Sequence, residues 1–174
     1  MNAAKPLREL DGVLLRKVMG SFASGVTVIV AEADGDIKGM TANAFLSGSL
    51  EPPLCVVSVA KRAHMHDHLA AARKFSVNIL AYAQEEVALH FAGRLPTTVV
   101  PTFQSEHGVP LLSDTTAQLT AEVTATHQCG DHTLFIGAIT WVTASDRLPL
   151  LYHASRFASL VPHREPDAPL LEFW

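Results

Sequence analysis

Charged residues, aromatic residues and cysteines are all scarce in this sequence. Of its 174 residues, 17% are charged and 7% are aromatic, and the formal net charge is -4. The 13 lysines and arginines are scattered along the chain, so nothing indicates binding to nucleic acid or to an anionic membrane surface. Hydrophobic residues nevertheless make up 48% of the chain, which excludes a disordered protein and predicts one folded domain with a full core.

Segments that direct a protein into or across a membrane are also absent from the sequence. No apolar run approaches the roughly 18 residues that span a bilayer, and the first twelve residues contain no apolar signal region. We therefore expect a cytoplasmic protein. Cys55 and Cys129 lie far apart in apolar, strand-like surroundings, so buried free thiols are expected rather than a disulfide.

Several well-known catalytic and cofactor motifs are missing. No GxGxxG occurs, which excludes a Rossmann dinucleotide site, and no GxSxG nucleophile turn is found. Gly20 and Gly25 have the spacing of a phosphate loop, but Val26 stands where that motif needs lysine. Residues 63–68 nearly match a metallohydrolase motif, but the acid is displaced, so no metal is predicted. The three histidines, His64, His66 and His68, form either a solvated helix face or cofactor contacts near the helix start.

The spacing of apolar residues predicts short helices among many strands in one domain, residues 1–174. Helices are expected at residues 6–19, 63–72 and 83–92, where apolar side chains recur at helical spacing. Strands are expected at residues 26–31, 37–44, 54–59, 75–80, 119–127, 133–143 and 148–152. Residues 94–112 are predicted to be a loop. Residues 1–12 are expected to form an N-terminal extension and residues 162–174 a C-terminal arm.

The order of these elements favours an antiparallel β-barrel with peripheral helices. The strands are joined by hairpins and short helices, as at residues 34–36, and they lack the regular βαβ alternation of a parallel sheet. Residues 133–143 are apolar on both faces. Such a strand needs cover on both sides, by the barrel interior and by a helix or a second subunit.

The stretch from Gly39 to Arg62 carries the strongest functional signal. It leaves a strand, passes through a turn rich in small and hydroxyl residues, and re-enters a strand after two prolines. Small residues there allow a ligand to approach the backbone closely. Polar side chains could meet the edge of a flat ring: Thr41, Asn43, Ser47 and Ser49.

The end of the same stretch could bind an anion. Ser58, Lys61 and Arg62 follow a predicted strand at the start of a predicted helix, where free N–H groups and the helix dipole favour phosphate. The alternative is an ordinary surface turn. Taken together, the stretch predicts a pocket for a flat, polar-edged, phosphate-bearing cofactor, which fits a flavin.

These segments resemble the short-chain flavin reductases, the NAD(P)H:flavin oxidoreductase components of two-component monooxygenases. The resemblance covers roughly residues 13–161. It rests on GVTVIV, GMTANAFLSGSLEPPL, VSVAKRAHMHDHL, FSVNIL, HFAG, GDHTLFIGAI and PLLYHASRFASL, which occur in the family's order. The resemblance implies a mainly β fold, an antiparallel Greek-key split β-barrel with peripheral helices that binds FMN and forms a homodimer.

The resemblance also implies roles for particular residues. The isoalloxazine ring would be lined by Thr41, Ala42, Asn43 and Ser47. The ribityl and phosphate end would lie along Ser58, Val59, Ala60 and Lys61. Ser49 and His64 are further candidate cofactor contacts. The site would be closed by Phe91, Ala92 and Gly93. His132 and Tyr152 would lie on the nicotinamide side, although His132 could equally be a turn residue. The chain departs from the family pattern at Ala63, Met65, Ser155 and Phe157.

The predicted activity is hydride transfer from NADH or NADPH to FMN or FAD, with reduced flavin passing to an oxygenase partner. The cofactor would supply the chemistry and the protein would hold the two rings together. One alternative is a non-catalytic flavin carrier that exchanges electrons with protein partners. Another is a barrel that binds a different anionic cofactor. Direct oxidation of NAD(P)H with free flavin separates the first hypothesis from the other two.

Overall fold

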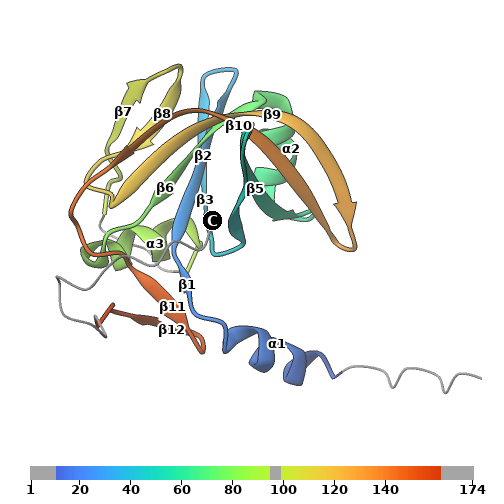
Figure 1. Ribbon diagram of the computed structural model, residues 1–174, viewed down its shortest axis with the longest axis vertical. Helices are drawn as coiled ribbons and strands as arrows, with labels where there is room; N and C mark the ends of the chain where they lie inside the picture. Colours follow the sequence, from blue (N-terminus) through green and yellow to red (C-terminus); the bar gives the residue numbers. More distant parts are fainter. Residues whose placement is uncertain (1–10, 95–98, 162–174) are drawn as a thin grey trace, which may run out of the picture.

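The computed structural model describes residues 11–94 and 99–161, and Figure 1 shows their arrangement. The predicted C-terminal arm and most of the predicted N-terminal extension lie outside the described residues. Within this part of the chain, no helix is long and apolar enough to cross a membrane.

A seven-stranded antiparallel sheet forms the body of the protein, in the order β3-β2-β6-β9-β10-β5-β4. Its strands are β2 (Thr27–Ala33), β3 (Asp36–Ala42), β4 (Phe45–Leu50), β5 (Pro53–Ala60), β6 (Lys74–Ile79), β9 (Ala117–Cys129) and β10 (His132–Ala144). The smaller sheets contain β1 (Ser24–Gly25), β11 (Leu151–His153) and β12 (Arg156–Ala158), and β7 (Phe103–Glu106) with β8 (Val109–Leu112). The predicted antiparallel split barrel with peripheral helices is confirmed.

The helices lie around the curved sheet, as Figure 1 shows. They are α1 (Gly12–Gly20), α2 (His64–Ala72), the short 3-10 helix η1 (Tyr82–Gln84) and α3 (Glu85–Phe91). Helix α2 packs against β2, β3, β5 and β6, and α3 packs against β2 and β3. Helix α1 extends away from the sheet and contains no buried residue.

Strand β2 separates two apolar clusters because its side chains alternate between its two faces. Ile29 and Ala31 belong to a cluster with Phe75, Phe135 and side chains of α2. Val28 and Val30 belong to a second cluster, which includes residues of α3 and of the segment around β11. The second cluster lies beneath the pocket described below, so the two faces of one strand support the barrel and the pocket wall.

The predicted loop at residues 94–112 is wrong in its second half, because β7 and β8 form a hairpin there. The four residues of β8 are buried. The Asn78 side chain holds this hairpin on β6, because its amide oxygen accepts from the backbone N–H of Leu112 at 2.9 Å. The Ser76 hydroxyl donates to the carbonyl of Pro110 at 2.6 Å. These contacts join segments far apart in sequence, and the prolines conceal the strand pattern.

Other predicted boundaries also need correction. The first helix begins at Gly12, because Asp11 is extended and its carboxylate accepts a hydrogen bond from the backbone N–H of Val13 at 2.9 Å. The predicted hydroxyl-rich turn contains strand β4, which pairs with β5 through an irregular register at residues 47–49. Cys55 is buried as expected, and burial raises the pKa of its thiol to about 11. The same prediction is wrong for Cys129, which is exposed because it lies at the end of β9, beyond the buried part of that strand.

Candidate functional site

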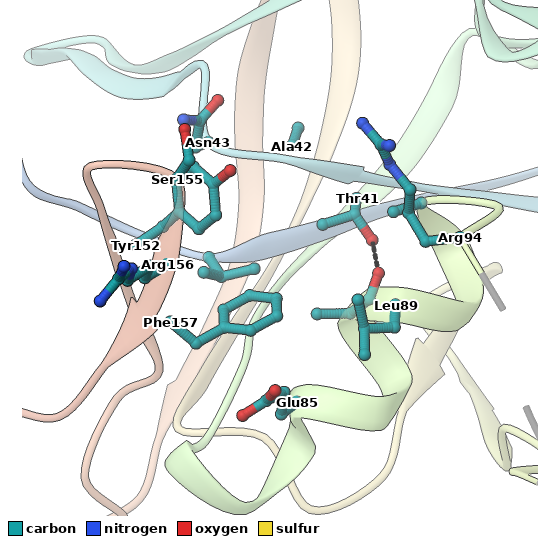
Figure 2. A pocket seen from close by; sticks show the side chains of 13 residues that line it. Thr41, Ala42, Asn43, Glu85, Leu89, Arg94, Tyr152, Ser155, Arg156 and Phe157 are labelled. Atoms are coloured by element: carbon teal, nitrogen blue, oxygen red, sulfur yellow. Dashed lines mark hydrogen bonds between the residues drawn. The ribbon is translucent and has the colours of Figure 1, made fainter. Parts of the chain in front are cut away.

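A cavity of about 890 Å³ opens between the end of β3, helix α3 and the β11–β12 hairpin. Apolar side chains of Leu89 and Phe157 contribute to its floor (Figure 2), and Val26 also lines it. Polar and charged side chains stand around its rim: Asn43, Glu85, Arg94, Tyr152, Ser155 and Arg156. A cavity with an apolar floor and a polar rim suits a flat aromatic ring whose edges carry hydrogen-bonding groups.

Two hydrogen bonds hold the end of β3 against its neighbours. The Thr41 hydroxyl donates to the carbonyl of Ala88 on α3 at 2.7 Å, and the Thr27 hydroxyl donates to the carbonyl of Ala42 at 2.7 Å. The next side chain, Asn43, is exposed on the cavity rim. Its amide makes no hydrogen bond with the described residues, so both its donor and its acceptor are available to a ligand.

The opposite wall is a tight hairpin turn that adopts left-handed backbone conformations without glycine. Ala154 has φ 48° and Ser155 has φ 63°. The turn is fixed by the backbone N–H of Ala154, which donates to the carbonyl of Gly20 at 2.8 Å. The rings of Tyr152 and Phe157 pack edge to face, with centroids 5.7 Å apart. Both side chains line the cavity, so the strained turn positions two aromatic groups there.

The C-terminus of α3 forms the third wall. The backbone N–H of Arg94 donates to the carbonyl of Leu89 at 3.1 Å, and Gly93 adopts the left-handed conformation, φ 65°, that ends many helices. Ala92 lines the cavity. Phe91 instead packs against Gly39 of β3, where an added Cβ would lie 2.5 Å from its ring. Only glycine at position 39 lets α3 approach the sheet this closely.

A second group of predicted site residues meets where β5 pairs with β10. Ala60 lies opposite His132, and the Lys61 ammonium donates to the carbonyl of Gly130 at 2.8 Å. The ring of His132 lies 2.8 Å from the carboxylate of Asp131, and the hydrogen bond and charge of His132 lower the pKa of that carboxyl. The Val59 side chain faces the core.

The two groups are connected through the backbone. The N–H of Ser58 donates to the carbonyl of Ala44 at 3.0 Å, and Ala44 directly follows the rim residue Asn43. This hydrogen bond holds the end of β5 beside the residue that follows Asn43. A ligand with a ring in the cavity and a phosphate near the start of α2 would pass beside this contact.

Some predicted residues lie outside the cavity. Ser47 and Ser49 lie on β4 beside β5, and His132 lies at the start of β10 rather than with Tyr152. On α2, His64 is exposed as a solvated face requires, but His68 is buried and its Nε2 lies 3.1 Å from the carbonyl of Ala31. His66 Nε2 lies 2.9 Å from the Thr133 hydroxyl, so His66 and His68 are structural contacts.

Glu85, Arg94 and Arg156 are rim residues that the sequence analysis missed. Arg94 directly follows the predicted residue Gly93, and Arg156 lies in the same segment as the predicted residue Tyr152. Their positions relative to motif residues were the available signal. No group of three or more metal-ligating side chains occurs among the described residues.

Comparisons with known proteins identify the family. Residues 19–161 match the model of the flavin reductase like domain. An NADH-dependent flavin reductase from Rhodococcus sp is 41% identical over 155 residues, 87% of this chain and 88% of that protein. The reductase component of 4-nitrophenol 4-monooxygenase/4-nitrocatechol 2-monooxygenase from Rhodococcus opacus is 34% identical over 160 residues, 91% of this chain and 86% of that protein.

A solved structure is similar over nearly the same region. It is the NADH:FAD oxidoreductase SgcE6 of Streptomyces globisporus in complex with NAD and FAD fragments, with a TM-score of 0.82 and 37% identity, covering 90% of this chain and 99% of that one. This chain therefore belongs to the flavin reductase like family. The family predicted from the sequence is confirmed, and the names of these relatives favour the reductase hypothesis over the flavin carrier.

Proposed function

We propose that this chain reduces FMN or FAD with NADH and delivers the reduced flavin to an oxygenase partner. The observation that carries the proposal is the cavity of about 890 Å³ with an apolar floor and a polar rim, in a chain of this family. Relatives named as NADH-dependent support NADH as the donor, and a relative named as an oxygenase's reductase component supports the partner. A reductase that draws on NADH would work in the cytoplasm.

The residues of the cavity fit a flavin ring. The free amide of Asn43 would bind the polar edge of the ring, while Thr41 and Ala42 present the end of β3 to it. Ala92 and Gly93, with Phe91 packed behind them, would close the α3 side. Bound flavin supplies the acceptor for a hydride from the nicotinamide ring. The chain's role is to place the two rings together and to exclude water.

The remaining predicted residues would bind the ends of the two nucleotides. Ser58, Ala60 and Lys61 would carry the flavin phosphate, since they lie at the N-terminal side of α2 with His64. Tyr152 would contact the nicotinamide from the cavity wall. His132 would act from the start of β10, beside Ala60.

The proposed function is tested by absorbance at the NADH band, with purified protein, NADH, and FMN or FAD added in turn. We expect rapid loss of NADH that depends on both protein and flavin, and the two rates rank the flavins. NADH that persists while the protein retains yellow flavin would support the carrier instead. A protein that neither oxidises NADH nor binds flavin would contradict both hypotheses.

We also propose that the functional unit is a homodimer in which α1 packs against a second copy. Nine-residue helices are marginally stable in water unless they pack against something. In the described chain α1 has no buried residue. Large apolar side chains on and just after it are more than half exposed: Val13, Leu14, Val18, Met19 and Phe22. A second copy of the chain would cover this surface.

The dimer is tested with a double substitution, Leu14→Glu with Val18→Glu, which adds two charges to one face of α1. Light scattering after size exclusion should give twice the chain mass for the wild type and the single-chain mass for the variant. Lys17→Glu on the same helix is the control, and it should remain dimeric. A wild type that elutes as a monomer would contradict the proposal.

A further inference from the structure

Two arginines on the cavity rim have no ionic partner within the described residues. Elsewhere in this part of the chain, Arg73 donates to the carbonyl of Val123 at 2.9 Å and Arg147 pairs with Asp114 at 3.0 Å. Arg94 and Arg156 make no such contact, although both line the cavity. Figure 2 shows Arg156 turned outward on the hairpin wall and Arg94 rising beside Thr41 at the opposite wall.

The backbone of Arg94 is fixed, although its side chain is free. Its N–H bonds to Leu89, and the preceding glycine has the left-handed conformation that terminates α3. Thr41 ties the same end of α3 to β3 through the carbonyl of Ala88. The guanidinium therefore starts from a well-defined point at the cavity mouth. The only carboxylate on the rim among the described residues, Glu85, lies at the other end of α3 (Figure 2).

A positive charge next to the C-terminus of a helix is favourable on electrostatic grounds alone. This helix effect explains why a cation is favourable at position 94, but it does not explain why the side chain lines the cavity. Arginine binds phosphate groups through two parallel N–H donors. A free guanidinium at the mouth of a cavity is therefore suited to an anionic ligand.

The proposed reaction needs two nucleotides whose rings meet while their phosphates lie elsewhere. One possible phosphate site, residues 58–61, is reached from Asn43, through the hydrogen bond between Ser58 and Ala44. Arg94 stands across the rim, beside Thr41 and α3. With the flavin phosphate on the Asn43 side, the cation on the α3 side remains for the second nucleotide.

We propose that Arg94 binds the pyrophosphate of the nicotinamide dinucleotide and so selects NADH over donors that lack phosphate. This inference rests on the proposed function, because it takes the flavin to occupy the Asn43 side. Arg156 would add a second positive charge on the hairpin wall of the same cavity. The role of Arg94 is to recognise and position the donor, and it takes no part in moving the hydride.

The inference is tested with Arg94→Gln, using excess FMN so that the flavin carries no pyrophosphate. Two hydride donors are compared: NADH, and 1-benzyl-1,4-dihydronicotinamide, which has the ring but no phosphate. We expect Arg94→Gln to lower kcat/KM for NADH about tenfold, the usual effect of losing a charge-assisted hydrogen bond. The kcat/KM for the phosphate-free donor and the KM for FMN should not change. Arg94→Lys should recover part of the loss.

A binding measurement without turnover accompanies the kinetics. Calorimetric titration with ADP-ribose, which carries the pyrophosphate without nicotinamide, should show a Kd about tenfold higher in Arg94→Gln. Lys74→Gln is the control, because it removes the same charge from an exposed pair with Glu122 on the far strands β6 and β9. It should match the wild type in both measurements.

Three results would overturn the inference. They are an equal loss with both donors, an unchanged kcat/KM for NADH, or a loss of affinity for FAD alone, which would place the FAD pyrophosphate at Arg94. If the wild type oxidises neither donor, the proposed function fails. The ADP-ribose titration then still decides whether Arg94 binds a pyrophosphate.

Discussion

Replacing Asn43 with leucine is expected to weaken flavin binding by about 30-fold while leaving the stability of the protein unchanged. The Asn43 amide is exposed on the cavity rim and bonds to no other described residue, so its removal costs the folded chain little. In the complex, the polar edge of the flavin would lose about two hydrogen bonds and face an apolar side chain. This change would weaken the binding free energy by roughly 2 kcal/mol. Quenching of flavin fluorescence measures the Kd.

An unchanged Kd for flavin in Asn43→Leu would contradict the proposed role of Asn43. The urea midpoint of the same variant should stay at the wild-type value, which shows that any loss of affinity arises at the site. Asn78→Leu makes the identical chemical change away from the cavity rim. Comparing the two variants therefore shows how the loss of an asparagine from the interior differs from its loss at the cavity rim.

Asn78→Leu is expected to lower the free energy of unfolding by about 3 kcal/mol, as the loss of a buried hydrogen-bond network does. Asn78 is fully buried. Its amide nitrogen donates to the carbonyl of Val28 and to the Ser76 hydroxyl, and its oxygen accepts from the Leu112 N–H and from Gln118. Leucine removes all four hydrogen bonds. Gln118 and Ser76 keep their bonds to the carbonyls of Leu112 and Pro110, but the buried N–H of Leu112 loses its partner, so the cost exceeds that of one ordinary hydrogen bond.

Urea unfolding followed by circular dichroism measures the effect of Asn78→Leu. Asn43→Leu is the matched control, and it should unfold within about 0.5 kcal/mol of the wild type, as surface substitutions usually do. A loss below about 1 kcal/mol in Asn78→Leu would mean that the network contributes little. The β7–β8 hairpin would then be held mainly by its apolar residues.

Local sequence signals were sufficient for the strands that carry their own pattern. The β-branched run of β2 and the turn at Asp34 and Gly35, where both φ angles are positive, could be predicted because neighbouring residues determine them. The elements that carry the predicted site residues could thus be predicted, whereas the roles of those residues stay predictions.

Contacts between distant segments could not be predicted in the same way. The β7–β8 hairpin depends on Asn78, more than 30 residues before Leu112. The ring of buried His68 contacts the carbonyl of Ala31 on β2, although the residues around His68 in the sequence are typical of an exposed helix. The cavity combines the end of β3, the end of α3 and the β11–β12 turn. Arg94 and Arg156 gain their significance only from that assembly, because their neighbours in the sequence do not show that both line one cavity.

The hydrogen bond between Ala154 and Gly20 has a consequence for regulation by association. It joins the last residue of α1 to the turn that carries Tyr152 and Ser155 into the cavity. Covering α1 and filling the cavity therefore act on one shared backbone contact. If packing of α1 against a second copy raises affinity for a ligand in the cavity, then by thermodynamic reciprocity that ligand strengthens the packing of α1 by the same free energy.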